Sequence, residues 1–226
     1  RGLGDVYKRQ VTSYGDSPYQ SFSAFAGNPY FISLDALVEE GVLTAAECKK
    51  ASFGRKADDI DYSRLYTQRG RLLRLAYSRS DIGHNAEFTA FCEQNKWWLD
   101  DFALFMAVKG RFEGKPWIEW AEDIRLRWQP AMDYYRRELY FEVEYHKYLQ
   151  FKFDQQWRKL KDYANSKGIR IIGDIPIYVA LDSADAWANP GLFQLDKDNI
   201  PTAVAGVPPD GFSPTGQLWG NLSLIH

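Results

Sequence analysis

The fold of this chain is limited chiefly by an apolar run rich in Ile and Val, IRIIGDIPIYVA, at residues 169–180. Such a run is typical of a β-strand that is buried on both faces. An amphipathic helix is predicted before it, with one stripe formed by Phe153, Trp157, Leu160 and Ala164. Gly168 suits the residue after the last turn of that helix. A helix followed by a buried strand is the repeating step of an α/β barrel or of a doubly wound sheet, and both remain open at this point.

One charged residue, Asp174, interrupts the apolar run. In barrel enzymes the polar side chains at the carboxyl ends of the strands form the active site, because the loops that follow the strands converge there. A buried carboxylate without a partner is costly, so a merely structural Asp174 would need an Arg or backbone donors nearby. We interpret Asp174 as a functional residue and keep the structural role as the alternative.

Residues 33–150 are predicted to form a helical subdomain. Ser33 suits the N-cap of its first helix, and Gly41 suits the residue after the last turn of that helix. The sequence TAAE at residues 44–47 is a capping box for the next helix. These local signals predict two short helices in succession.

Longer helices are predicted farther along this subdomain. In residues 63–79 the residues near one face are Leu65, Leu72, Ala76 and Tyr77. The next stripe repeats at three- and four-residue steps, at Phe88, Phe91, Asn95, Trp98, Phe102, Phe105 and Met106. Helices continue through Trp117, Trp120, Trp128 and the run at residues 134–148, with Pro116 and Pro130 suited to first turns or breaks.

Two stretches are predicted to be ordered loops. Residues 12–30 consist largely of Gly, Ser, Pro and aromatic residues, and a flexible linker would not carry so many rings. Residues 207–221 are dense in Gly, Pro, Ser and Gln, and they follow a strand-like hairpin, LFQLDKDNIPTAVAG, at residues 192–206. In the second loop, two prolines fix the backbone before Asp210, and Trp219 offers a ring flanked by Gln217 and Asn221. This loop is suited to clamp a polyhydroxylated ligand, although an ordinary surface loop with a locally packed Trp fits the composition equally well.

The aromatic content of 16%, with 8 Trp and 14 Tyr, is unusually high. Aromatic rings stack on the apolar faces of sugars, while neighbouring polar groups bind the hydroxyls. Buried aromatic residues nevertheless outnumber those that bind ligands, so composition by itself favours a Trp-rich core.

Charge and motifs exclude several classes of function. The net charge of -2 leaves no excess of basic residues for nucleic acid or an anionic membrane, and charges interrupt every apolar run before the roughly 18 residues of a membrane span. With no signal peptide at its start, we expect a cytoplasmic protein, in which Cys48 and Cys92 are buried thiols.

The sequence contains no Ser/His/Asp set, metal-ligand spacing or phosphate loop, and His84 and His146 are isolated. We interpret the acidic residues in the helical region as solvated helix ends without a catalytic role: Asp58, Asp59, Asp61, Asp100 and Asp101.

Three segments together resemble one enzyme family. They are SYGDSPYQSFSAFAGNPYFISLDAL, IIGDIPIYVALDSADAWANPGLFQLD and VAGVPPDGFSPTGQLWGN. The combination is similar to amylomaltase, the 4-alpha-glucanotransferase of glycoside hydrolase family 77. The resemblance covers residues 12–221. Its first and last motifs are long and specific, whereas the helical region between them resembles the family mainly in pattern.

The resemblance implies a fold and an activity. The fold is an α/β one: this chain would be a fragment of a (β/α)8 TIM barrel with a large, mainly helical inserted subdomain. Its parts would be a glucan-binding loop of the barrel at residues 12–32, the inserted subdomain at 33–150, and a barrel helix, a strand and a substrate-binding lid loop at 151–221. We read residues 1–11 and 222–226 as non-native, linker-derived tails. The family acts without a cofactor on α-1,4-glucans, namely maltodextrin, starch and glycogen.

The resemblance also assigns site residues. The positions that match glucan-binding positions of the family are Ser17, Tyr19, Asp174, Asp210, Phe212, Gln217 and Trp219. No catalytic residue is expected in this chain, because the family's Asp nucleophile and Glu acid/base follow later barrel strands, beyond Asn221. Such retaining enzymes place these two carboxylates about 5 Å apart. This chain alone is therefore expected to be inactive, and the activity to belong to the full-length protein.

Two alternatives remain from the sequence. One is a non-catalytic module that binds α-glucan and has the aromatic clamp without the barrel. The other is a fragment of an amylase-like glycoside hydrolase, which would carry a calcium site, and the sequence shows no cluster of oxygen ligands with that spacing.

Overall fold

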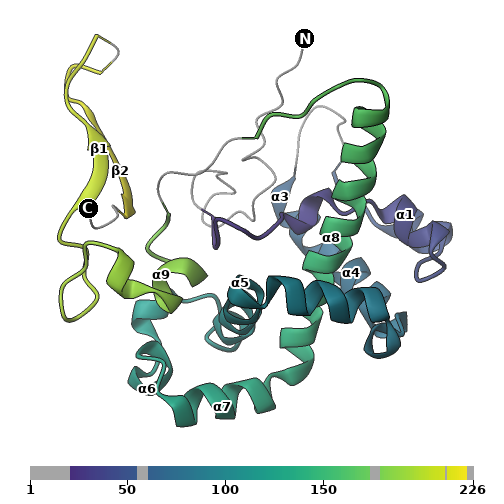
Figure 1. Cartoon of the computed structure of the whole chain (residues 1–226), viewed down its shortest axis with the longest axis horizontal. Helices are drawn as coiled ribbons and strands as arrows, with labels where there is room; N and C mark the ends of the chain where they lie inside the picture. Colours follow the sequence, from purple (N-terminus) through teal and green to yellow (C-terminus); the bar gives the residue numbers. More distant parts are fainter. Residues whose placement is uncertain (1–20, 55–60, 174–178, 212, 223–226) are drawn as a thin grey trace. The chain divides into compact units, whose positions relative to one another are not determined.

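The computed structural model describes residues 21–54, 61–173, 179–211 and 213–222. This part of the chain is mostly helical, and its two strands form one antiparallel sheet (Figure 1). The helices are α1 Leu34–Glu39, α2 Ala45–Lys50, α3 Tyr62–Arg64, α4 Gly70–Arg79, α5 Ala86–Arg111, α6 Glu122–Arg125, α7 Gln129–Glu138, α8 Tyr140–Ser166 and α9 Ala184–Ala188. The strands are β1 Val204–Val207 and β2 Gln217–Leu222. Single 3-10 turns lie at Pro29–Phe31, Ile82–His84, Trp117–Glu119 and Pro190–Leu192, and a π-helical turn, Leu65–Arg69, links α3 to α4.

The predicted helix ends in the first half of the chain are confirmed. The Ser33 hydroxyl accepts a hydrogen bond from Ala36 N at the start of α1, and Gly41 adopts a φ of 77° just after it. Thr44 and Glu47 form the predicted capping box of α2. A short side chain that satisfies a free N–H of the first turn stabilises a helix by about 1 kcal/mol, so such signals act within a few residues and can be read locally.

One predicted helical run is interrupted. The run at residues 134–148 is split, because α7 ends at Glu138 and α8 begins at Tyr140. Leu139 between them has φ -105° and ψ 21°, outside the helical region. The spacing of apolar residues continues unchanged across this break, so the sequence pattern does not reveal the end of one helix and the start of the next.

The chain divides into two compact units, and helices α5 and α8 contribute residues to both. The second unit comprises Gly27–Lys96 and Glu144–Ile171. Its buried core is formed by Ile32, Leu37, Leu43, Leu72, Leu73, Ala76, Tyr145, Tyr148 and Leu149. The predicted stripe of α4 supplies two of these residues, Leu72 and Ala76, so the amphipathic pattern there is confirmed.

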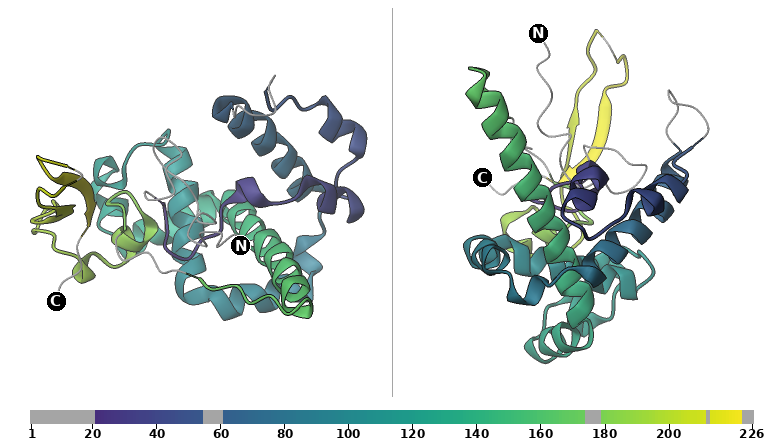
Figure 2. Two further views of the ribbon diagram at one scale, coloured as in Figure 1. Left: turned by 90° about the horizontal axis from the view of Figure 1, so that it is seen from above. Right: turned by 90° about the vertical axis from the view of Figure 1, so that its right-hand side faces the viewer.

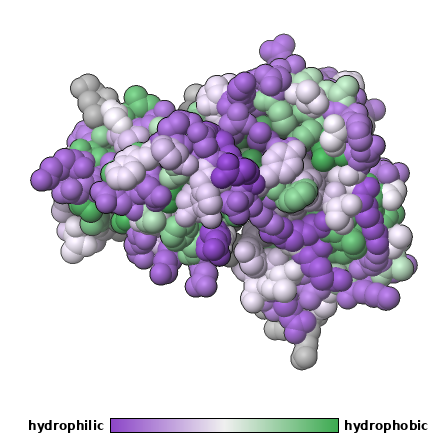
Figure 3. All heavy atoms as spheres, turned by 90° about the horizontal axis from the view of Figure 1, so that it is seen from below, coloured by the Kyte–Doolittle hydropathy of each residue, from purple (hydrophilic) through white to green (hydrophobic). Residues whose placement is uncertain are grey.

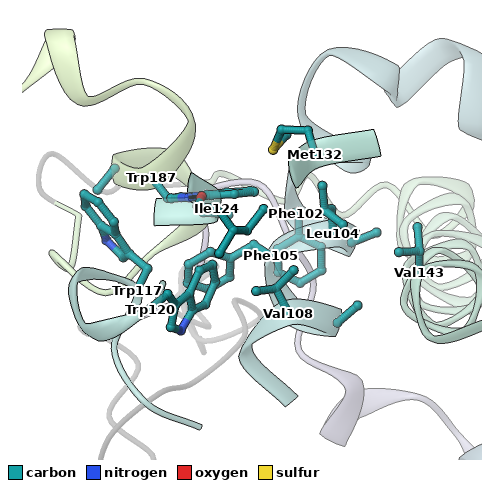
Figure 4. Packing of buried hydrophobic residues seen from close by; sticks show 14 of the residues in the cluster. Phe102, Leu104, Phe105, Val108, Trp117, Trp120, Ile124, Met132, Val143 and Trp187 are labelled. Carbon is teal, nitrogen blue, oxygen red and sulfur yellow. Dashed lines mark hydrogen bonds between the residues drawn. The ribbon is translucent and has the colours of Figure 1, made fainter. Parts of the chain in front are cut away.

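The first unit comprises the described residues among 1–26, Trp97–Val143 and 172–226. Its core is aromatic: the rings of Phe105, Trp120 and Trp187 contact one another, and Trp117 is fully buried nearby (Figure 4). The interpretation of the high aromatic content as core is confirmed for these residues. Trp128, in contrast, is 52% exposed.

The predicted buried strand at residues 169–180 is not seen in its described part. Residues 169–173 have no regular secondary structure, and Ile169 and Ile172 are 59% and 74% exposed. Val179 makes one isolated bridge, antiparallel to Leu222, and residues 174–178 lie outside the described residues. A run of β-branched residues favours a strand only where a neighbouring strand pairs with it, and no described residue pairs with 169–173.

The β structure near the C-terminal end also differs from the prediction. Within the predicted hairpin at residues 192–206, only Leu195 and Pro201 form a bridge. The stronger pairing joins β1 to β2, which lie side by side in Figures 1 and 2. Residues 207–221, predicted to be a loop, thus contain most of a strand. Leu222, which we set apart as tail on sequence grounds, is fully buried in the core of the first unit.

None of the described helices is both long enough and apolar enough to cross a membrane. On the face shown in Figure 3, hydrophobic residues are scattered among hydrophilic ones.

Candidate functional site

The hairpin of β1 and β2 carries the three predicted site residues that the structure describes: Asp210, Gln217 and Trp219. The strands are antiparallel, with Val207 opposite Gln217 and Gly206 opposite Leu218. Residues 208–216 connect them. The hairpin is attached to the rest of the first unit through Leu222, whose N–H donates to the Val179 carbonyl at 2.8 Å.

Asp210 holds the connection between the strands in a fixed shape. Its Oδ1 accepts a hydrogen bond from Ser213 N at 2.8 Å, and its own N–H donates to the Ser213 carbonyl at 3.0 Å. The Ser213 hydroxyl in turn donates to the Gly216 carbonyl at 2.7 Å. An Asp that bonds the backbone in this way stabilises a turn, so one oxygen of the predicted sugar-binding carboxylate is engaged inside the loop.

Gly216 is required where the connection enters β2. Its φ is 73°, in the left-handed region that residues with a Cβ rarely adopt. A Cβ at this position would lie 2.5 Å from the Val207 carbonyl oxygen and 3.0 Å from the Pro208 carbonyl carbon. Only glycine allows this close approach of the two strands.

Gln217 and Trp219 act as a pair. Alternate residues of a strand point to the same side, and the Trp219 Nε1 donates to the Gln217 Oε1 at 3.0 Å. Because an indole nitrogen can only donate, it faces the amide oxygen and leaves the amide NH2 group for other acceptors. The Trp219 residue is 42% exposed, so its indole and the Gln217 amide stand side by side at the surface.

A second group of contacts joins residues 21–26 to the segment around α9. Asp185, in the first turn of α9, accepts a hydrogen bond from Ala24 N at 2.7 Å and one from the Ser23 hydroxyl at 3.3 Å. Ala184 N donates to the Phe22 carbonyl at 2.8 Å. Burial raises the pKa of Asp185, and the two hydrogen bonds act in the opposite direction.

A buried ion pair fixes the same segment from its other side. Lys109 Nζ of α5 lies 2.5 Å from Asp182 Oδ2, and Asp182 Oδ1 accepts from Trp117 N at 3.2 Å. Lys109 also donates to the Lys115 carbonyl. A buried ion pair is tolerated when further hydrogen bonds satisfy its members, as they do here.

The comparisons with known proteins decide the family. The family model for 4-alpha-glucanotransferase matches residues 3–224. The chain belongs to this family, glycoside hydrolase family 77. It is 50% identical over 211 residues to the 4-alpha-glucanotransferase of Clostridium butyricum, covering 93% of this chain and 43% of that protein. The enzyme of Thermus thermophilus is 47% identical over 214 residues, which cover 93% of this chain and 42% of that protein.

Solved structures agree with this assignment. An amylomaltase from Streptococcus agalactiae in complex with acarbose superposes with a TM-score of 0.90 at 43% identity, over 96% of this chain and 44% of that one. The amylomaltase from Corynebacterium glutamicum shares the fold, with a TM-score of 0.69 at 21% identity over 96% of this chain and 30% of that one. The chain thus spans less than half the length of these 4-alpha-glucanotransferases and amylomaltases.

Four predicted site residues lie outside the described residues: Ser17, Tyr19, Asp174 and Phe212. The structure brings Gln217 and Trp219 together and places Asp210 in the same hairpin. It therefore supports a shared location for three of the seven predicted residues, and the place of the other four stays a prediction.

Several supporting residues were missed by sequence reasoning: Ser23, Lys109, Asp182, Asp185 and Ser213. Ser213 lies three residues after its partner Asp210, so that bond had a local signal. For the others, the only local signal is the segment LDSADAW, in which Ser183 caps α9 and the two Asp residues flank it. The partners of these Asp residues are 161 and 73 residues away in the chain, so no pattern in the sequence could have matched them.

Other predicted roles can be compared with the structure. Asp61 caps α3, as expected of an acidic residue at a helix start. The interpretation of Asp100 and Asp101 as a helix end is wrong, since both lie within α5, and Asp101 pairs with Arg127 at 2.6 Å. Cys48 and Cys92, expected to be buried thiols, are only half-buried. His84 is exposed and pairs with Asp81, which raises its pKa. Among the described residues, no group of three or more His, Cys, Asp or Glu could hold a metal ion.

Proposed function

We propose that this chain is part of a cytoplasmic 4-alpha-glucanotransferase that transfers a segment of an α-1,4-glucan to the 4-hydroxyl of an acceptor glucan or glucose. The observation that carries the proposal is the Trp219 and Gln217 pair on the hairpin of a chain that belongs to this family. An exposed indole beside an amide donor suits a sugar ring, which has apolar faces and hydroxyl edges. The bound acarbose of the Streptococcus agalactiae amylomaltase supports a sugar ligand for the family.

The proposed reaction has two displacements. A carboxylate attacks the anomeric carbon of the donor while a carboxylic acid protonates the departing glycosidic oxygen. The 4-hydroxyl of an acceptor then attacks the glycosyl-enzyme and returns its proton to the second carboxylate, with retention of configuration. By family resemblance, this Asp nucleophile and Glu acid/base belong to the part of the whole enzyme beyond Asn221, in a (β/α)8 barrel.

The residues of this chain would contribute to binding of the glucan substrate. By resemblance, Asp174 faces the cleft near the donor sugar and Asp210 binds sugar hydroxyls near the scissile bond. The hairpin would also help to keep water from the glycosyl-enzyme, so that a glucan hydroxyl attacks instead. Maltodextrin, starch and glycogen are the substrates of this class.

The test is to incubate maltotriose with the whole enzyme and with the 226-residue chain alone, and to separate the products by chromatography. We expect the whole enzyme to form glucose together with maltodextrins longer than maltotriose, and the chain alone to form neither. Glucose and maltose without longer products would show a hydrolase. Glucan binding without any reaction by the whole enzyme would instead support the non-catalytic binding module.

A further inference from the structure

Asp210 is the one Asp in the sequence that is followed by Gly, and no Asn is followed by Gly. In an Asp–Gly pair the backbone nitrogen of the Gly can attack the side-chain carboxyl carbon of the Asp, because glycine has no Cβ to obstruct the approach. The attack needs an accessible carboxyl group, an accessible nitrogen, and a side chain that is turned toward the residue after it. Asp210 and Gly211 meet these three conditions.

Both residues are exposed, in the connection between β1 and β2. Asp210 Oδ1 accepts a hydrogen bond from Ser213 N at 2.8 Å, so the carboxyl group is turned toward the residues that follow it in the chain. Among the described residues, none accepts a hydrogen bond from the Gly211 N–H. A Cβ added to Gly211 would meet no atom within 4 Å, so the space around this residue is open. The carboxyl group can therefore reach a nitrogen that nothing else engages.

Asp196 provides a comparison within the same chain. It is exposed, and its Oδ1 accepts hydrogen bonds from Asp198 N and Ile200 N, both at 2.9 Å. Its own N–H donates to the Ile200 carbonyl at 2.8 Å, just as the Asp210 N–H donates to a later carbonyl. The carboxyl groups of the two Asp residues are thus held in a similar way, but Asp196 is followed by Lys197. The Lys197 side chain obstructs the nitrogen that would have to attack, whereas Gly leaves it open.

We propose that Asp210 is a site of spontaneous isomerisation to isoaspartate, through a succinimide ring formed with Gly211. The Gly211 nitrogen bonds to the Asp210 Cγ, and the hydroxyl of the protonated carboxyl group leaves with the amide proton as water. A water molecule then opens the ring. Where it attacks the main-chain carbonyl carbon of Asp210, the bond from that carbon to the Gly211 nitrogen breaks, and the main chain runs through the former side chain. Where it attacks Cγ, aspartate is restored. One water is released and one is taken up, so no cofactor or oxidant is needed.

Isomerisation changes the hairpin at its proposed sugar contact. The main chain gains a methylene group, and the original α-carboxyl group becomes the side chain. The two bonds between Asp210 and Ser213 depend on the original spacing of the backbone, so the connection between the strands loses its fixed shape. The effect on activity rests on the proposed function, in which Asp210 binds sugar hydroxyls: the isomerised enzyme loses transfer activity, and bound glucan slows the isomerisation because it engages the carboxyl group.

The test is to age the whole enzyme in warm, neutral buffer and to measure isoaspartate over time. An isoaspartyl methyltransferase gives the total amount, and peptide mapping with a protease that cuts before Asp but not before isoaspartate gives the position. We expect isoaspartate to accumulate at residue 210 and not at Asp196. Gly211→Ala should slow its formation at least about tenfold, which is a difference of about 1.4 kcal/mol in the barrier. The fresh variant should keep the activity and melting temperature of the unsubstituted enzyme, since the added Cβ meets no atom within 4 Å.

Absence of isoaspartate at residue 210, equal amounts at Asp196, or an unchanged rate in Gly211→Ala would overturn the proposal. Transfer activity with maltotriose, measured on the same samples, separates this proposal from the proposed function. Activity that falls in proportion to isoaspartate, and falls more slowly in Gly211→Ala, supports both. Isoaspartate at residue 210 with full activity supports the modification site and contradicts the sugar contact of Asp210.

Discussion

The indole nitrogen of Trp219 donates a hydrogen bond to the amide oxygen of Gln217, at 3.0 Å, on one side of β2. This contact joins two residues that the composition of their segment and the family resemblance both indicated as candidates for glucan binding. It also fixes the orientation of the ring relative to the amide, so the surface offered to a ligand has an apolar part and a polar part in a defined arrangement.

Replacing Trp219 should therefore weaken glucan binding, and two substitutions separate the contribution of the ring from that of its bond to Gln217. We expect Trp219→Ala to weaken binding of maltoheptaose to the whole enzyme at least about tenfold, since ring stacking and area burial together exceed about 1.4 kcal/mol. Trp219→Phe keeps a ring and loses the bond to Gln217, so its loss should be smaller. Calorimetric titration measures both. Trp128→Phe, at an indole of similar exposure, is the control, and an equal effect at Trp128 would contradict a specific role for Trp219.

Asp210 combines a turn-forming bond with a predicted contact to sugar, and two substitutions can separate them. Asp210→Ala removes the acceptor of Ser213 N and the charge, whereas Asp210→Asn removes only the charge. We expect both variants to lower kcat/KM for maltotriose by about 10- to 100-fold, the cost of a lost charge-assisted contact in the transition state. Only Asp210→Ala should also lower the melting temperature. If Asp210→Asn kept full activity, the carboxylate would have a purely structural role.

The hairpin that carries these residues should be sensitive to a single methyl group at Gly216. Gly216→Ala would place a Cβ 2.5 Å from the Val207 carbonyl oxygen at a φ of 73°. We expect a loss of about 1–3 kcal/mol in the free energy of unfolding, the usual cost of such a strained backbone. Gly211→Ala, in the same connection, meets no atom within 4 Å and is the control for stability. Equal denaturation midpoints for the two variants would contradict this geometry.

Local signals in the sequence predicted the structure best. The Ser33 cap and the capping box at Thr44 each depend on residues within one helical turn, and both are confirmed. The pairing of β1 with β2 was missed because the residues between the strands are rich in Gly and Pro, which usually indicates a loop. In that hairpin Gly216 lies just before β2 and Gly220 lies inside it, and both have a positive φ.

Long-range contacts could not be predicted from one sequence. The bond from Ala24 to Asp185 joins residues 161 positions apart, and nothing in either segment specifies the other. At residues 169–173 the sequence predicted a strand that the structure does not contain. The composition of this run favours a strand, but a strand forms and is buried only where other strands pair with it, and Ile169 and Ile172 are exposed. Family resemblance supplied the site residues that physical patterns alone did not.

The ion pair between Glu47 and Arg79 predicts how the stability of the second unit depends on pH. The Arg79 guanidinium and the Thr44 hydroxyl and N–H donate to the Glu47 carboxylate, and they lower its pKa from the usual 4.5 to about 2. A lowered pKa in the folded state means that the unfolded chain binds the proton more readily. The contribution to stability is therefore fully present above pH 4.5 and is lost as the pH falls toward 2.

Glu47→Gln tests this dependence directly, because Gln can still accept from the Thr44 N–H while the charge is gone. We expect the variant to melt at a lower temperature than the unsubstituted chain at pH 7, and the gap to close as the pH falls from 4.5 to 2. High salt should narrow the gap at pH 7, since both partners are partly exposed and their attraction is screened. Glu39→Gln, at an exposed carboxylate of α1, is the control and should show no such dependence. A gap of constant size from pH 7 to pH 2 would mean that Glu47 acts through the capping box alone and that its charge contributes nothing.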